Sequence, residues 1–298
     1  MQKPDPNGPS DSITLFTLTS TLTLSLFGAH ITSFTVQNQE RLWMSSLAVL
    51  DGSKPIRGGV PIAFPQFADE GNMKLHGFAR EAMWRVESLE DSKVVLKLNA
   101  EEESKAIWGN DFELTYTVEL LVDSLDLNLS VKNTNTNDKP FSFTGCLHSY
   151  FLFDETANVE LNGGLEGKRY IDKCDGRKEK VQEGLGIVIP VEAKKSGEEG
   201  GREGYVDRIY LNTAGQCTFS RGGKQLYKVK QSESWPDTTL YNPWLGDKQG
   251  PMIGPDFDDD GYTKMICLEP TISKGNAVTL EVGETWEGWQ RIQVEKEF

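Results

Sequence analysis

Residues 114–132 read LTYTVELLVDSLDLNLSVK, and this stretch decides the fold class. Apolar side chains stand at every second position from Leu114 to Leu120 and again from Leu125 to Val131. Successive side chains of a strand point to opposite faces, so each run predicts a strand with one buried face. Asp123-Ser124 between the runs suits a tight turn, which predicts an antiparallel hairpin.

Shorter β-prone segments extend this pattern to both sides of the hairpin. No helix-period segment exceeds a couple of turns, and we find neither an internal repeat nor a linker. The chain is therefore expected to be all-β, a large antiparallel β-sandwich or barrel over residues 13–298, because so much sheet must bury one face. The further predicted strands are 22–26, 31–36, 93–98, 141–151, 205–211, 217–220, 225–230, 264–269, 277–282 and a last one within TWEGWQRIQVE.

Two segments look irregular. Residues 1–12, MQKPDPNGPSDS, have no hydrophobic signal core and are expected to form a flexible tail. Residues 162–204 are rich in Gly, Lys and Glu, and SGEEGGREG (196–204) is predicted to be a mobile loop.

The composition excludes several partners. A net charge of −14 argues against nucleic acid and against anionic membrane surfaces, and no apolar run is long enough to span a bilayer. The four cysteines are scattered without a CxxC pair, which favours reduced thiols in the cytoplasm. Three histidines without ligand spacing make a metal site unexpected. We expect a monomer that acts on a small molecule.

One stretch, RGGVPIAFPQFADEGNMKLHGFAR (57–80), is unusual for a purely structural segment. Arg57 precedes two glycines, which let a chain pass close to a ligand, and two prolines stiffen the path. If residues 76–80 are extended, His76 and Arg80 share a face. With Gln66, these groups would suit an oxygen-rich or anionic ligand. The alternative is a proline-rich loop with solvated arginines.

Polar residues on two predicted strands are candidates for acid–base chemistry. In FSFTGCLHSYF (141–151), His148 lies on the face that is small and polar, and an imidazole titrates near neutrality. In KMICLEP (264–270), Glu269 ends an apolar strand and is followed by a proline. Asp207 interrupts the β-prone GYVDRIYL. Each also has a plain interpretation: a hydrogen-bonded core histidine, a solvated carboxylate and a turn residue.

The motifs of other enzyme classes are missing from the sequence. There is no GxSxG, no GxxxxGK[ST], no GxGxxG that opens a helix and no HExxH. A glycosidase with paired carboxylates stays open at this point.

Six short motifs occur in a specific order: RGGVPIAFPQF, HGFAR, the histidine of HSYF, VDRIY, YNPW and LEP. Together they span nearly the whole chain and resemble the hexose-6-phosphate mutarotase branch of the aldose 1-epimerase family. The resemblance implies a galactose mutarotase-like β-supersandwich and interconversion of the α and β anomers of glucose 6-phosphate. It also implies that neither a metal nor an organic cofactor is needed.

The resemblance assigns a role to each candidate. Glu269 matches the general base and His148 the general acid. Arg57, Arg80 and Asp207 match substrate-binding positions, with His76 beside them. The family often has glutamine where this chain has Leu75, so a substrate contact is either missing or supplied by Gln66.

Two other functions stay open beside the lead hypothesis. One is an aldose 1-epimerase for unphosphorylated sugars. The other is a non-catalytic carbohydrate-binding protein on the same fold, although such a protein has no need for an acid–base pair.

Overall fold

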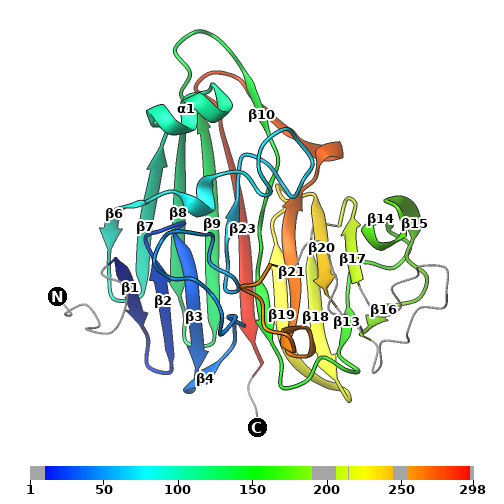
Figure 1. Cartoon of the computed structure of the whole chain (residues 1–298). Helices are drawn as coiled ribbons and strands as arrows, with labels where there is room; N and C mark the ends of the chain where they lie inside the picture. Colours follow the sequence, from blue (N-terminus) through cyan, green and yellow to red (C-terminus); the bar gives the residue numbers. More distant parts are fainter. Residues whose placement is uncertain (1–10, 190–205, 214, 244–253, 296–298) are drawn as a thin grey trace.

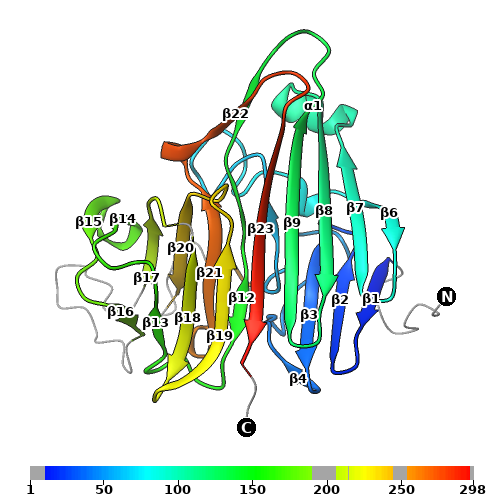
Figure 2. The same ribbon diagram turned by 180° about the vertical axis from the view of Figure 1, so that it is seen from behind.

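The computed structural model describes residues 11–189, 206–213, 215–243 and 254–295. The strands form two facing layers (Figures 1 and 2). A nine-stranded sheet makes one layer, and a four-stranded and an eight-stranded sheet lie side by side in front of it in the view of Figure 1. The predicted large antiparallel β-sandwich is confirmed.

The nine-stranded sheet runs, from edge to edge, through β16 (Gly186–Val188), β13 (Glu160–Asn162), β18 (Gln216–Arg221), β19 (Lys224–Gln231), β23 (Thr285–Val294), β9 (Ser124–Asn133), β8 (Phe112–Leu120), β7 (Lys93–Asn99) and β6 (Arg85–Leu89). Its long central strands are plain in Figure 2. This sheet supplies one continuous wall of the core.

The facing layer is divided. One sheet holds β1 (Ser12–Phe16), β2 (Ser20–Ser25), β3 (His30–Val36) and β4 (Gln39–Glu40). The other runs through β15 (Lys178–Val181), β14 (Arg169–Asp172), β17 (Val206–Tyr210), β20 (Asp237–Asn242), β21 (Met265–Ile272), β11 (Gly145–Leu147) and β5 (Ile62–Ala63), with β12 (Tyr150–Leu152) also paired to β21. A separate pair joins β10 (Phe141–Phe143) to β22 (Val278–Leu280).

Helices are short. The described residues contain one α-helix, α1 (Glu102–Trp108), and four 3₁₀ turns. Two of these turns, η1 (Ala79–Glu81) and η2 (Lys173–Asp175), carry residues discussed below; η3 (Gly261–Thr263) and η4 (Lys274–Asn276) do not. Within the described ranges, no helix is long and apolar enough to cross a membrane.

The hairpin predicted from the alternating pattern is confirmed. β8 and β9 pair in register from Phe112 opposite Asn133 to Leu120 opposite Leu125. The turn lies at 121–123, one residue earlier than expected, and Ser124 already belongs to β9. Every apolar residue of the two alternating runs is buried, so hydrophobic burial fixes the register.

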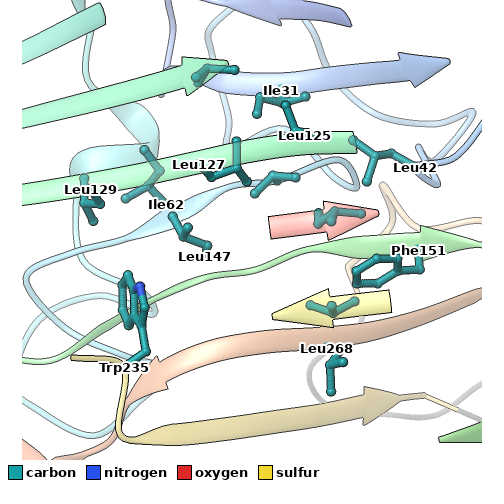
Figure 3. Packing of buried hydrophobic residues seen from close by; sticks show 14 of the residues in the cluster. Ile31, Leu42, Ile62, Leu125, Leu127, Leu129, Leu147, Phe151, Trp235 and Leu268 are labelled. Carbon is teal, nitrogen blue, oxygen red and sulfur yellow. The ribbon is translucent and has the colours of Figure 1, made fainter. Parts of the chain in front are cut away.

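Core side chains from all three large sheets meet between the layers. Figure 3 shows Ile31 of β3 near Leu125 and Leu127 of β9, with Leu147 of β11 and Phe151 of β12 farther along the same core. This packing holds the eight-stranded sheet firmly in place against the nine-stranded sheet.

The single strand predicted for 141–151 is wrong. The run is divided among β10, β11 and β12. At the second break the Ser149 amide donates to the Leu147 carbonyl at 2.9 Å, which makes a tight turn centred on His148. His148 thus lies between β11 and β12, and its amide donates to the Pro61 carbonyl at 3.0 Å.

Part of the prediction for 162–204 is also wrong. β14, β15, β16 and η2 lie within this segment. No apolar run signalled β14 or β15, whereas β16 overlaps the apolar run 187–189. SGEEGGREG lies outside the described residues. So do residues 1–10 of the predicted tail, and its last residue, Ser12, is the first residue of β1.

Candidate active site

A cavity of about 230 Å³ opens on the eight-stranded sheet, where β17, β20 and β21 meet the loops around them. Six of the seven residues proposed from sequence line it, and the exception is Gln66. Its polar lining comprises Lys54, Arg57, His76, Arg80, His148, Tyr150, Lys173, Asp207, Thr239, Tyr241, Asp256 and Glu269.

Glu269 is held in the middle of a buried strand. The expectation of a strand-end position is wrong, because β21 continues through Pro270 to Ile272. Glu269 stands opposite Thr239 of β20 and is 1% exposed, and its Oε2 has no hydrogen-bond partner. Burial raises its pKa to about 8, although a hydrogen bond from the Cys146 thiol partly opposes the rise.

His148 faces Glu269 from the turn between β11 and β12. Its Nδ1 lies 3.4 Å from Glu269 Oε1, but the two groups are not aligned as a hydrogen bond. The imidazole stacks on the Tyr150 ring, with centroids 4.6 Å apart and planes 9° from parallel. Burial lowers the pKa of His148 to about 3, and the charges of Arg80 and Arg57 lower it further. The imidazole is therefore neutral at pH 7.

Arg57 enters the cavity from a tightly packed loop. Gly58 and Gly59 have φ of 108° and 61°, and a Cβ on Gly59 would lie 2.0 Å from the Ile31 carbonyl oxygen. Gly59 therefore serves a close approach to the backbone of β3 and Gly58 one to the backbone of Trp43 and Met44, where sequence reasoning expected an approach to a ligand. Arg57 Nη2 lies 3.3 Å from Asp256 Oδ1.

The expectation of an extended 76–80 segment is wrong. His76 has φ of +63°, and Arg80 belongs to η1. The Phe78 and Ala79 amides both donate to the Phe64 carbonyl, which folds the segment back. His76 and Arg80 still reach the same cavity, because the turn brings them there.

Arg80 and His76 have different surroundings. Arg80 Nη2 donates to the Leu75 carbonyl at 2.7 Å, and in the described part of the chain no carboxylate forms an ion pair with it. His76 Nδ1 accepts from the Ala68 amide at 3.2 Å, so its proton is on Nε2. The His76 ring meets His148 edge-on, with centroids 5.3 Å apart.

Asp207 and Lys173 form a buried ion pair at the cavity wall. Asp207 lies on β17 opposite Tyr241 of β20, and its Oδ2 is 2.8 Å from Lys173 Nζ. Burial raises the pKa of Asp207 despite this partner. Its Oδ1 is buried and has no hydrogen-bond partner.

Sequence reasoning missed Lys173, Tyr150, Tyr241 and Asp256. Lys173 lies in the irregular segment 162–204, where several lysines occur and none stands out by sequence. Tyr150 lies within the strand predicted for 141–151 but was given no role. Nothing local in the sequence distinguishes Asp256 from the acidic residues next to it.

Gln66 has a structural position. Its Nε2 donates to the Ala68 and Met73 carbonyls at 3.0 and 3.2 Å, and its Oε1 accepts from the Met73 amide at 3.0 Å. Gln66 is 2% exposed and does not line the cavity, so it organises the 66–74 loop. Leu75 lines the cavity in its own right.

His30 supports the loop that carries Arg57. It is fully buried, and its Nε2 donates to the Gly58 carbonyl at 2.9 Å. Burial lowers the pKa of His30 to about 3, so it stays neutral. All three histidines of the chain therefore lie in or beneath this site.

One group of side chains has the composition of a metal site. Ligand atoms of His148, Cys267 and Glu269 lie within 4.8 Å of one another. Burial raises the pKa of the Cys267 thiol far above its usual value, which disfavours the thiolate that metals prefer. The cavity also holds the cations of Arg57 and Lys173. This environment suits an anionic ligand better than a metal ion.

Comparisons with known proteins identify the family of the chain. The sequence model of the aldose 1-epimerase family matches residues 11–293. Two proteins named "Putative glucose-6-phosphate 1-epimerase" are similar in sequence. The one from Cenchrus ciliaris is 34% identical over 275 residues, covering 88% of this chain and 78% of that protein. The one from Escherichia coli (strain K12) is 27% identical over 255 residues, covering 82% and 77%.

Solved structures agree in fold. A "putative mutarotase" from Salmonella typhimurium superposes with a TM-score of 0.80 at 24% identity, covering 100% of this chain and 96% of that one. A galactose mutarotase-like protein from Lactobacillus casei gives 0.72 at 17% identity, covering 95% and 100%. At these identities the likeness concerns the fold alone. Because the family model spans nearly the whole chain, this protein belongs to the aldose 1-epimerase family.

Proposed function

We propose that this protein interconverts the α and β anomers of D-glucose 6-phosphate. The observation that carries the proposal is a buried imidazole–carboxylate pair, His148 and Glu269, 3.4 Å apart in a cavity that two arginines also line. The family assignment and the names of the curated relatives support it.

The proposed chemistry needs one acid and one base on a sugar ring. Glu269 removes the proton from the anomeric hydroxyl while His148 protonates the ring oxygen, and the C1–ring oxygen bond breaks to give the open-chain aldehyde. After rotation about C1–C2, the hydroxyl adds to the other face of C1 and both protons return. Positioned proton transfers of this kind commonly contribute about 10²–10⁴-fold each.

The remaining polar groups would bind the substrate. Arg80 has its charge uncompensated by any ion pair within the described residues, and its guanidinium suits a phosphate. Arg57 lies on the same cavity with Asp256 as a partner. The free Oδ1 of Asp207 would accept a hydrogen bond from a sugar hydroxyl.

The decay of optical rotation after α-D-glucose 6-phosphate is dissolved tests the proposal. We expect the wild type to accelerate the decay above the protein-free rate and Glu269→Gln to lose the acceleration. Glu87→Gln, on the exposed strand β6, is a matched control that should behave like the wild type. Acceleration that survives in Glu269→Gln would argue against this base.

The two arginines distinguish the phosphorylated substrate from a free sugar. Replacing Arg57 and Arg80 by glutamine should damage turnover of glucose 6-phosphate far more than that of glucose. Equal losses would favour an aldose 1-epimerase for unphosphorylated sugars. Binding of the sugar phosphate with no acceleration by any variant or the wild type would favour a carbohydrate-binding protein.

Three further points belong to the same proposal. We treat residues 13–298 as one domain, since both layers of sheet build one core. We also propose that the protein is a monomer. The four unpaired cysteines support a cytoplasmic location.

A further inference from the structure

The fixed charges of the cavity act unequally on its acid–base pair. The guanidinium groups of Arg80 and Arg57 bear on His148 and lower its pKa, whereas the charged residues that bear on Glu269 are Asp207 and Lys173. All four side chains line one cavity, and the charges of the arginines act more strongly on the imidazole than on the carboxyl. An anion bound at those arginines would offset their charge mainly at His148.

The pKa values of the pair place its proton on the carboxyl, which does not suit the proposed reaction. With the pKa of Glu269 raised to about 8 and that of His148 lowered to about 3, the carboxyl holds the proton at pH 7 and the imidazole is neutral. Proton transfer by a glutamate base and a histidine acid needs the opposite arrangement. Both arrangements contain the same single proton, and His148 Nδ1 lies 3.4 Å from Glu269 Oε1.

We propose that Arg57 and Arg80 form an anion subsite whose occupation activates the pair: a phosphate dianion bound there drives the proton from Glu269 to His148. In this step the O–H bond of the carboxyl breaks and an N–H bond forms on the imidazole, with no other change. The inference rests on the proposed function and extends it, because the phosphate of the substrate becomes an activator as well as a handle for binding.

Other charged or titratable groups on the cavity do not replace this effect. Lys173 also lowers the pKa of His148, but its charge is paired with Asp207 at 2.8 Å. His76 is buried with its pKa lowered well below the usual value, and burial raises the pKa of Tyr150, so both are neutral. A dianion at the arginines is thus the change in charge to which His148 is most sensitive.

The consequence is that the phosphate should raise turnover as well as affinity. Interactions with a remote part of a substrate accelerate a reaction only when they favour the transition state over the ground state. Each pKa unit regained by His148 favours the active arrangement tenfold, since one unit is about 1.4 kcal/mol.

The test supplies the substrate in two pieces. D-Xylose has the pyranose ring without the phosphorylated carbon, and phosphite supplies the dianion. We expect phosphite to raise the protein-catalysed exchange of xylose anomers at least tenfold, after the protein-free rate at each phosphite concentration is subtracted. In Arg80→Gln the ratio of rates with and without phosphite should fall toward one, and in Arg85→Gln, on exposed β6, it should not.

A second measurement detects the protonation state of His148 directly. In ¹³C NMR spectra of the histidine rings, saturating phosphite should convert one of the three imidazoles, that of His148, from neutral to protonated at pH 7. The assignment comes from its loss in His148→Gln. A ring that stays neutral with phosphite bound would overturn the proposal.

The kinetic outcomes distinguish a failure of phosphate activation from a failure of the proposed function. If phosphite competes with glucose 6-phosphate but leaves xylose exchange unchanged, the subsite provides affinity alone and the activation proposal is overturned. That result would favour an exchanged assignment, with His148 as base and Glu269 as acid. If phosphite does not compete at all, the subsite itself is wrong. If glucose 6-phosphate is not turned over, the proposed function fails instead.

Discussion

The β8–β9 hairpin and the face formed by β17, β20 and β21 use buried positions in opposite ways. Along β8, burial alternates strictly, and every buried side chain is apolar or aromatic. All eight residues of β21 are buried, and one of them is the carboxylate of Glu269. In the nine-stranded sheet these buried positions hold apolar side chains that stabilise the fold. In the eight-stranded sheet some of the buried positions hold polar groups instead.

Two buried carboxylates within the eight-stranded sheet refine this comparison. Asp237 of β20 is fully buried and accepts four hydrogen bonds, from Asn212, Asn276 and twice from Ser273. Glu269 of β21 is as deeply buried, yet its Oε2 is unpartnered. The fully hydrogen-bonded Asp237 fixes a loop, whereas Glu269, with one unpartnered oxygen, lines the cavity.

The largest effect should follow from breaking the acid–base pair. We expect His148→Gln and Glu269→Gln each to lower kcat for glucose 6-phosphate by about 10²–10⁴-fold. The double variant should be no slower than the slower single variant, because residues that act as a unit are not additive. Initial rates of anomer exchange check this. Losses that multiply in the double variant would mean that the two groups act independently.

A substitution in the core of the nine-stranded sheet should lower stability and leave activity nearly unchanged. Leu127→Ala removes a fully buried side chain of β9 and should lower the free energy of unfolding by about 2–5 kcal/mol. Turnover per folded molecule should stay within about twofold of the wild type, because the cavity lies on the other sheet. Urea unfolding measures the loss, with Lys132→Ala on the exposed side of β9 as the control. A stable but inactive Leu127→Ala would contradict the division of roles.

Burial of Glu269 should make stability depend on pH. Its pKa is raised from 4.5 to about 8 on folding, so the wild type loses stability as pH rises through that window. Glutamine cannot ionise. Glu269→Gln should therefore be more stable than the wild type at pH 9, by a few kcal/mol at about 1.4 kcal/mol per pKa unit. Thermal unfolding from pH 5 to 9 tests this, and a difference that does not vary with pH would refute it.

The smallest effect concerns the ion pair at the cavity wall. Lys173→Met leaves Asp207 buried without its partner and should raise KM for glucose 6-phosphate about tenfold, near 1.4 kcal/mol, with a smaller change in kcat. Lys173→Arg should restore most of the affinity. Lys178→Met is the control, since the Lys178–Asp175 pair is exposed and contributes little. Equal KM values for both methionine variants would remove Asp207 from the binding site.

Local pattern predicted most of the long strands. Alternation from Leu114 to Val131 determined both the hairpin and its buried face, because hydrophobic burial acts residue by residue along a strand. The same reasoning failed for 141–151, where a turn at His148 interrupts an apolar run without glycine or proline at the break. It also failed for β14 and β15, because their charged residues are typical of a loop.

The site was predictable mainly through the resemblance to a family. No rule of periodicity brings Arg57, His148, Asp207 and Glu269 together, since they come from separate strands and loops joined only by the topology of the sheet. Gln66 was predicted to contact the substrate, but its side-chain amide forms hydrogen bonds within its own loop. Lys173 was missed because its role depends on the ion pair with Asp207, which only the folded structure reveals.

Exchange between the α and β anomers of glucose 6-phosphate at equilibrium is the most direct test of the central claim. Saturation transfer between the two anomeric protons in NMR measures it without a change in concentration. We predict faster exchange with wild-type protein than without protein, and no such increase with Glu269→Gln at a concentration that still binds the sugar phosphate. Equal exchange with the wild type and the variant would contradict the claim that His148 and Glu269 of the eight-stranded sheet carry the reaction.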